Sequence, residues 1–195
     1  MKSVVRTISI YVFLFVITGL LYPFVITNIG RIFFKEKVKG SIIYRDGRPV
    51  ASKLIAQPFV SPYLFWGRPS TNNYNPLSSG GSNLGPTNPE LYRVVKERIK
   101  NLRRSGFDGP VPSYLVFASG SGLDPHLPPY AVYSQVERVS RYTGIPKDLL
   151  YRLIEKHTEK RFLGFIGEER VNILELNLEL LGLMDKYRKS SSSGM

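Results

Sequence analysis

The segment that decides the fold is residues 7–30, TISIYVFLFVITGLLYPFVITNIG, which lie between Arg6 and Arg31 and carry no charge. At about 1.5 Å of rise per residue, an α-helix of this length crosses a hydrocarbon core of about 30 Å. A cleaved signal peptide has a shorter apolar region and a small-residue cleavage site, and neither is present here. We therefore predict an uncleaved transmembrane helix over residues 7–30, preceded by a short cytoplasmic N-terminus, residues 1–6.

Three residues near the middle of this segment, Gly19, Tyr22 and Pro23, suggest a contact with another helix in the membrane. Small residues let helices approach closely, and a proline frees a backbone carbonyl that a neighbouring helix can bond. Gly and Pro are also common in membrane helices in general. The sequence leaves both interpretations open.

Charge and residue content exclude several classes of function. The chain has 195 residues, with 27 basic against 15 acidic side chains and a net charge of +12. Such a chain suggests nucleic acid or the lipid bilayer as a partner. Its basic pairs carry no interleaved aromatic residues of the kind that single-stranded nucleic acid requires, so we expect no nucleic-acid partner. The chain has no cysteine, and its two histidines are too far apart for a usual ligand spacing, so we expect no metal site.

Turn and cap signals outline the rest of the chain. Asp46-Gly47 between apolar runs predicts a hairpin, and Asn88-Pro89-Glu90 predicts the start of a helix. Further helices are expected from Pro128 to Gly144, from Pro146 onward, and over residues 171–184, where leucine spacing favours helix over strand.

These elements predict an α+β fold: a single N-terminal transmembrane helix followed by one compact domain with a small hairpin and several helices. Residues 31–185 are long enough to bury a core of their own. Residues 186–195 are expected to form a disordered tail.

Residues 57–89 form an unusual connection. Twenty of these 33 residues are Pro, Gly, Ser or Asn, and Arg68 is the one charge. A flexible linker of this composition would lack aromatic residues such as Phe65 and Trp66. A long ordered loop is commonly functional. The sequence predicts either a partner surface that includes Phe65, Trp66 and Arg68 or a structural wrap around the domain.

Residues 119–126, SGSGLDPH, bring Ser121, Asp124 and His126 close together in sequence and invite a hydrolase interpretation. A nucleophile elbow needs Gly two residues before and after the serine, and neither Ser119 nor Ser121 has that pattern. Ser and Asp in glycine-rich segments also tend to bond the local backbone, as in turns. We favour turn chemistry and assign no catalytic residue.

A polar stripe lies on the helix expected after Pro128. Gln135, Arg138 and Arg141 are spaced three residues apart, away from the valines of the same helix. Such a stripe is either a solvated face or a recognition surface for a protein or a phosphate.

The residues then point to a family. The chain resembles the C chain of the Kdp potassium-transporting ATPases over residues 15–180. The motifs that carry the likeness are TGLLYP at 18–23, GS at 40–41, LIAQPF at 54–59, FWGRPS at 65–70, SGGSNLGPTNP at 79–89, ASGSGLDPH at 118–126, QVERV at 135–139 and GEERVNILELNLEL at 167–180.

The resemblance implies an accessory subunit that is not an enzyme by itself. Its partners would be a channel-like potassium-translocating chain and a P-type ATPase chain that hydrolyses ATP. The family is described as a catalytic chaperone that raises the ATP affinity of the ATPase chain in a high-affinity potassium uptake complex. No cofactor would be bound independently, and ATP would be shared with the ATPase chain.

The family's Q-V-P-R-V motif carries a glutamine linked to nucleotide contact, which Gln135 matches. Here Glu137 replaces the proline of that motif, which restores a backbone donor and favours an uninterrupted helix around Gln135. Other candidates for the partner surface are Ser121, Asp124, His126 and Arg138. A contact between Gln135 and ATP conflicts with a domain outside the cytoplasm. An alternative is that the domain covers the outer mouth of the channel chain and stabilises the complex.

Orientation is predicted differently by two arguments. Basic residues such as Arg31, Lys35 and Lys37 follow the membrane segment, and this charge bias alone would place the domain in the cytoplasm. The resemblance implies a single-pass protein of the cell membrane with the bulk of the chain outside the cytoplasm. Large domains translocate despite flanking charge, so we expect the extracytoplasmic orientation.

Two hypotheses of other classes remain beside the subunit. A membrane-anchored surface hydrolase would use Ser121, Asp124 and His126, and its isolated domain would be active. A stand-alone surface-binding module would be stable without a membrane partner.

Overall fold

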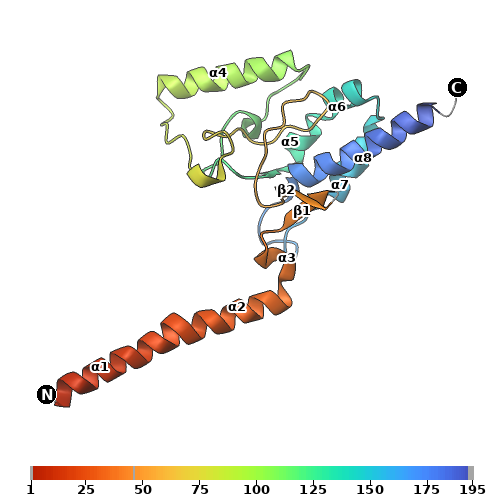
Figure 1. Cartoon of the computed structure of the whole chain (residues 1–195). Helices are drawn as coiled ribbons and strands as arrows, with labels where there is room; N and C mark the ends of the chain where they lie inside the picture. Colours follow the sequence, from red (N-terminus) through yellow and green to blue (C-terminus); the bar gives the residue numbers. More distant parts are fainter. Residues whose placement is uncertain (1, 46, 193–195) are drawn as a thin grey trace. The chain divides into compact units, whose positions relative to one another are not determined.

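A computed structural model describes residues 2–45 and 47–192, with side chains described as far as Tyr187. The chain divides into two compact units, residues 1–52 and residues 53–195 (Figure 1). The boundary between the units falls after a hairpin whose two strands pair with each other. The division expected at residue 30, between a membrane helix and an extracytoplasmic domain, stays a prediction.

The first unit begins with a helix that runs without interruption over Lys2–Phe33. It comprises α1 (Lys2–Phe15), a π-helical stretch (Val16–Leu21) and α2 (Tyr22–Phe33), and none of their residues is buried. Among the described residues, this is the helix whose length and apolar content suit a membrane. A helix therefore covers the predicted membrane segment, residues 7–30, with extra residues at both ends.

The π-helical stretch contains Gly19 and ends two residues before Pro23, which lies in α2. The Tyr22 N–H donates to the carbonyl of Ile17, five residues earlier, in place of the usual four. The Thr18 hydroxyl bonds the carbonyl of Leu14 at 2.8 Å. Because Pro23 has no N–H, the carbonyl of Gly19 loses its ordinary α-helical donor, and a widened turn accommodates that loss.

A short helix and the predicted hairpin complete the first unit. Helix α3 (Lys35–Val38) leads to β1 (Ile42–Arg45) and β2 (Arg48–Ser52), which pair antiparallel with a register shift between Ile43 and Tyr44. Gly47 has φ +75°, a conformation that suits glycine in a tight turn. The hairpin is confirmed, although Asp46 of its turn lies outside the described residues.

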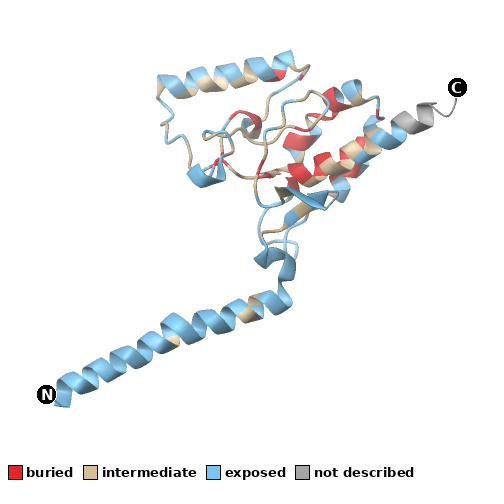
Figure 2. Ribbon diagram, viewed as in Figure 1, coloured by how far each residue is buried: buried red, intermediate tan, exposed pale blue. Residues whose placement is uncertain are grey.

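The second unit is built from helices around a three-stranded antiparallel sheet of order β3-β5-β4. Its elements are η2 (Pro76–Ser78), α4 (Pro89–Arg104), η3 (Ser113–Leu115), β3 (His126–Leu127), α5 (Pro129–Tyr133), α6 (Val136–Thr143), α7 (Lys147–Lys156), β4 (Thr158–Glu159), β5 (Arg170–Asn172) and α8 (Ile173–Ser192). Its core lies among α5 to α8 (Figure 2).

Two helices follow the sequence prediction closely. At the start of α4, the Asn88 side chain accepts a hydrogen bond from the Glu90 N–H at 2.9 Å, as the cap signal predicted. In α7, Leu150, Leu153 and Ile154 are buried. Caps and apolar periodicity therefore located both elements.

Two expectations about the second unit are wrong. The helix expected from Pro128 to Gly144 is interrupted at residues 134–135, between α5 and α6. There the Gln135 N–H bonds the carbonyl of Val132, three residues earlier, so the chain tightens into a turn. Residues 171–172 belong to strand β5, because they pair with β3 and β4. Helix α8 is described as far as Ser192. The disordered tail expected over residues 186–195 stays a prediction, and residues 193–195 lie outside the described residues.

Candidate functional site

The loop over residues 57–89 wraps around the domain and places aromatic side chains inside it. Phe65, expected on a partner surface, is fully buried in the core. Trp66 is half-buried against that core, and its indole N–H donates to the carbonyl of Ser61 at 2.9 Å. The structural-wrap interpretation therefore describes this part of the loop.

Gln135 holds the loop in place. Its amide oxygen accepts from the Trp66 N–H at 2.8 Å, and its amide nitrogen donates to the Trp66 carbonyl at 3.0 Å. The same oxygen accepts from Arg138 at 2.7 Å, and the same nitrogen donates to Ala131 at 3.3 Å. The side chain is 0% exposed, and its two hydrogens and its oxygen are all used within the domain.

Asn177 on α8 makes the same pair of hydrogen bonds to the backbone of Phe65, the residue before Trp66. Its amide oxygen accepts from the Phe65 N–H at 2.9 Å, and its amide nitrogen donates to the Phe65 carbonyl at 2.8 Å. The backbone of residues 65–66 is thus bonded by side-chain amides of α8 and of the turn before α6. Buried backbone groups require such partners because an unpaired one destabilises the fold.

Arg138 completes this arrangement, which we call the amide clamp (Gln135, Arg138 and Asn177). Its guanidinium donates to the carbonyl of Leu64 at 2.9 Å and to that of Pro62, and it lies 5.1 Å from the centre of the Trp66 ring. The side chain is 1% exposed. Burial lowers the pKa of Arg138 to about 10, so the group stays protonated at neutral pH.

The clamp changes the interpretation of the polar stripe. Gln135 and Arg138 are buried, whereas Arg141 is exposed and paired with Asp108 at 3.0 Å. Arg138, expected on a partner surface, is an internal residue because the loop covers it. Nucleotide contact at Gln135 stays a prediction, and it would require the clamp to open.

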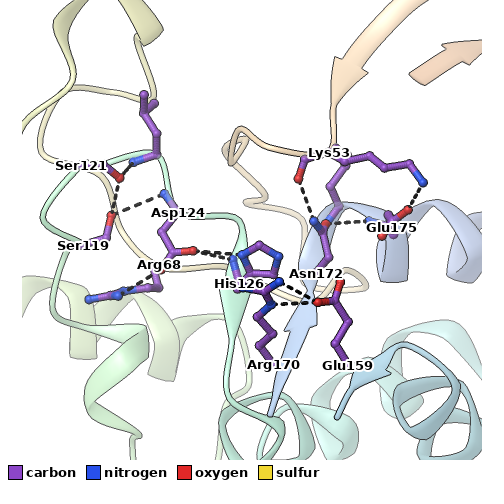
Figure 3. Close-up of polar contacts among 12 residues, drawn as sticks. Lys53, Arg68, Ser119, Ser121, Asp124, His126, Glu159, Arg170, Asn172 and Glu175 are labelled. Carbon is purple, nitrogen blue, oxygen red and sulfur yellow. Dashed lines mark hydrogen bonds and ion pairs between the residues drawn. The ribbon is translucent and has the colours of Figure 1, made fainter. Parts of the chain in front are cut away.

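The 119–126 segment forms a turn network (Figure 3). The Ser121 hydroxyl accepts from the Leu123 N–H at 3.1 Å and lies 3.4 Å from the Ser119 hydroxyl. Ser119 in turn accepts from the Asp124 N–H at 3.5 Å. These are the local backbone contacts expected of turn residues.

Asp124 links this turn to the loop and to β3. Its carboxylate accepts from the His126 N–H at 3.0 Å, lies 3.3 Å from His126 Nδ1, and pairs with Arg68 at 3.2 Å. Burial alone would raise the pKa of Asp124, but the bonds from His126 and the charge of Arg68 outweigh it and lower that pKa. Asp124 is therefore held as a carboxylate.

Arg68 is fixed on three sides. Besides Asp124, it donates to the carbonyl of Ala118 at 3.1 Å and stacks 5.0 Å from the centre of the Tyr114 ring. Arg68, Asp124 and His126 line a cleft of about 250 Å³ that Glu168 and Glu169 also border. The arrangement joins three segments of the domain and presents a polar cleft of mixed charge.

The glycines of two motifs allow a close backbone approach. The Gly80 N–H bonds the carbonyl of Ser121 at 2.9 Å, which brings residues 79–83 against residues 119–124. At Gly122, φ is +69° and an added Cβ would lie 2.7 Å from the Asn72 side chain and 3.0 Å from the Gly80 carbonyl. At Gly81 an added Cβ would lie 3.3 Å from the Gly120 carbonyl. Packing between the two segments therefore requires glycine at Gly122 and favours it at Gly81.

Metal chemistry finds no support in the residues that the structure describes. Among them, no three His, Asp or Glu side chains gather closely enough to hold an ion. The expectation of no metal site stays a prediction.

Sequence reasoning missed two features. Asn177 lies between Leu176 and Leu180, and a polar residue on an otherwise apolar helix face is the signal that could have identified it. The connection between β4 and β5 was also missed; it contains the apolar run RFLGFIG at 161–167, bounded by charges. Its side chains are exposed.

Together these observations define the class. One long apolar helix precedes a folded α+β unit whose conspicuous polar residues are bonded to one another and to the backbone. A helix suited to a membrane by length and composition, followed by a hairpin and a folded unit, is typical of single-pass membrane proteins.

The particular family follows from comparison with known proteins. The family model described as "K+-transporting ATPase, c chain" matches residues 4–181, so the chain belongs to that family. It is 42% identical to the potassium-transporting ATPase KdpC subunit of Caldanaerobacter subterraneus subsp. tengcongensis, over 96% of this chain and 99% of that protein. It is 48% identical to the KdpC subunit of Geobacter sulfurreducens, over 94% and 100%, and 46% identical to that of Geotalea uraniireducens, over 92% and 97%.

Proposed function

We propose that this chain is a non-catalytic accessory subunit of an ATP-driven, high-affinity potassium uptake complex. Its partners are a channel-like potassium-translocating chain and a P-type ATPase chain, and its bulk lies outside the cytoplasm. It stabilises the assembly and raises the affinity of the ATPase chain for ATP. The family match over residues 4–181 carries this proposal.

The geometry of the serine-rich turn supports the non-catalytic part. The Ser121 hydroxyl is engaged by the Leu123 N–H, and the His126 ring lies against Asp124. A hydrolytic triad needs the histidine to contact the serine through its other ring nitrogen. No such contact is made among the described residues, so the surface-hydrolase alternative gains nothing from this geometry.

The amide clamp supports an indirect effect on ATP. Every polar group of the Gln135 side chain is bonded inside the domain. A change in ATP affinity therefore reaches the ATPase chain through contacts between subunits. An accessory subunit does this by binding one conformational state of its partner more tightly than another, which shifts the population that binds nucleotide.

The first experiment joins composition with activity. The tagged full-length chain is co-expressed with the channel-like and P-type ATPase chains and purified in mild detergent. We expect stoichiometric recovery of all three and potassium-stimulated ATP hydrolysis, with a higher KM for ATP in complexes that lack this chain. Recovery of the chain alone contradicts the subunit proposal. An unchanged KM contradicts the effect on ATP affinity while leaving membership of the complex intact.

Orientation has its own test, because the chain contains no cysteine. Leu77→Cys introduces a thiol at a position that is 95% exposed in the second unit. Ser3→Cys places the control thiol in the first turn of the long apolar helix, before the predicted membrane segment at residues 7–30. In intact cells, an impermeant maleimide should label the first variant and spare the second. The reverse pattern contradicts the extracytoplasmic orientation.

A further inference from the structure

The connection between β4 and β5 carries large apolar side chains to the surface. Phe162, Leu163, Phe165 and Ile166 are 68%, 70%, 71% and 49% exposed, and we call these four residues the apolar tip. Single exposed apolar residues are ordinary, but a contiguous group of them marks an interaction site.

The tip is preorganised. Phe162 and Ile166 face each other in an antiparallel bridge, with reciprocal backbone hydrogen bonds of 2.9 Å. At its base, the Arg170 guanidinium bonds the Glu159 carboxylate at 2.8 Å. Strand β5 then enters the core at Val171, which is fully buried. A rigid hairpin of this kind loses little conformational entropy on binding.

The backbone of Leu163 is a second, independent observation. Its φ is +53°, in the left-handed region that Gly, Asn and Asp occupy far more readily than Leu. An exposed leucine in this conformation disfavours the fold and gains no burial within the chain. Residues held in such conformations cluster at functional sites.

The charges around the tip distinguish a protein partner from a lipid surface. Lys160 and Arg161 precede it, and Glu168 and Glu169 follow it; all four are exposed. Among the described residues, none of the four takes part in an ion pair. The two basic and two acidic residues balance, so the rim lacks the surplus of Lys and Arg that attracts a protein to anionic headgroups. An apolar centre with a rim of both signs is the anatomy of a protein–protein interface.

We propose that the apolar tip docks into an apolar socket on another chain of the ATPase complex. The socket carries an acidic group opposite Lys160 and Arg161 and a basic group opposite Glu168 and Glu169. This inference rests on the proposed function, because it takes the partner from the same assembly. It adds the surface through which this subunit is held.

Two variants test the tip without disturbing the fold. Leu163→Asn removes the apolar side chain and suits the positive φ, and Phe165→Ser removes the most exposed ring. The matched control is Leu77→Asn, which removes an exposed leucine elsewhere in the same unit. Each full-length variant is co-expressed with the two partner chains and purified in mild detergent, as for the wild type.

We expect the amount of partner chains recovered with each tip variant to fall about tenfold or more below the wild-type amount. This is the effect of losing a central interface residue. The control should retain them fully. Equal retention by all variants overturns the inference, while wild-type recovery of the complex leaves the proposed function standing. If the wild type also fails to recover partners, the proposed function itself has failed.

Cross-linking identifies what covers the tip. A photoreactive benzoylphenylalanine in place of Phe165 is activated in the assembled complex in native membranes. A covalent product with one of the ATPase chains supports the inference. A product with lipid alone, or no product in a complex of full composition, overturns it.

Discussion

The amide clamp and the apolar tip both depart from the usual rule that polar side chains are exposed and apolar side chains are buried. The clamp buries polar groups, and the tip exposes apolar ones. Gln135 and Arg138 are polar and almost fully buried, whereas Phe165 and Leu163 are apolar and about 70% exposed. The buried polar groups have partners for nearly all their hydrogen-bonding atoms within the domain. The side chains of Leu163 and Phe165, in contrast, are not packed against the rest of the domain. The clamp therefore serves the stability of the domain, and the tip serves what lies outside it.

This difference separates two quantities that mutations often change together. Removing a partner of a buried polar group leaves that group unsatisfied and lowers the free energy of unfolding. Removing an exposed apolar side chain changes that free energy little, because its area stays in contact with water in the folded state. Clamp variants should therefore lower the free energy of unfolding far more than tip variants do.

Gln135→Leu should have the largest effect. It leaves the Trp66 N–H and carbonyl and one Arg138 nitrogen without their partner inside the domain, and we expect a loss of about 3 kcal/mol in the free energy of unfolding. Urea unfolding of the full chain in detergent, followed by near-UV circular dichroism, measures it. The control Arg141→Ala alters an exposed ion pair and should stay within about 0.5 kcal/mol. Equal losses would show that the clamp is no more than a surface network.

Gly122→Ala should come next. The added Cβ meets the Asn72 side chain and the Gly80 carbonyl, at a φ of +69°. We expect a loss of about 2 kcal/mol. Gly85→Ala is the control, since an added Cβ there meets nothing within 4 Å and φ is not positive. Similar midpoints in urea for both variants would mean that the contact between residues 79–83 and 119–124 does not require glycine.

Lowering the pH should reduce stability at the contact between α7 and α8, and not at the clamp. Hydrogen bonds from Lys156 and then His157 lower the pKa of Glu179, which joins α7 to α8. A carboxyl group whose pKa is lowered by folding contributes stability above its unfolded pKa of about 4.5, and this contribution disappears as pH falls through the lower folded value.

The wild type should lose stability as the pH falls from about 5 to about 3, and Glu179→Gln should lose less. We expect the difference to be under about 1 kcal/mol, because the contacts of Glu179 with Lys156 and His157 are accessible to solvent. Urea midpoints at several pH values measure it. The clamp has no carboxylate or imidazole, so Asn177→Leu should lower stability equally across this range. A clamp variant that altered the pH slope would contradict the separation of the two regions.

Leu163→Asn should have the smallest effect on the chain by itself, and of opposite sign. Asn adopts the left-handed region more readily than Leu, so we expect a gain of about 0.5 kcal/mol in the free energy of unfolding. Thermal unfolding of the full chain without its partners is the measurement. A loss of more than about 1 kcal/mol would show that the apolar tip is part of the fold.

Signals within a few neighbouring residues were sufficient to predict the long apolar helix, the hairpin and the start of α4. The uncharged segment, Asp46-Gly47 and the Asn88 cap act within a few residues, and their outcome needs no knowledge of the rest of the chain. The same holds for α7, whose apolar face follows from helical spacing. The family was also accessible from sequence, because its motifs are numerous and ordered.

The clamp could not be predicted in this way. Spacing placed Gln135, Arg138 and Arg141 on one polar stripe, but the loop at residues 62–66 covers the first two and leaves the third exposed. That distinction depends on contacts about 70 residues apart in sequence. The break at residues 134–135 has the same origin, since Gln135 is held by the loop and neither Gly nor Pro marks the position.

The apolar tip was missed for a different reason. A run such as residues 161–167 is also typical of a buried strand, and hydrophobicity by itself does not distinguish burial in a core from burial against a partner. The exposure of these side chains in the folded chain excludes burial in its own core, and exposure is known only from the three-dimensional structure.

The π-helical stretch at Val16–Leu21 has a consequence for reading the membrane segment as a helical wheel. One extra residue in a turn rotates everything beyond it by about 100° relative to an ideal α-helix. Residues of α1 and α2 that a regular wheel places on one side therefore point in different directions. The faces of this helix toward lipid or toward other helices must therefore be assigned separately for α1 and for α2, on either side of the stretch between Phe15 and Tyr22.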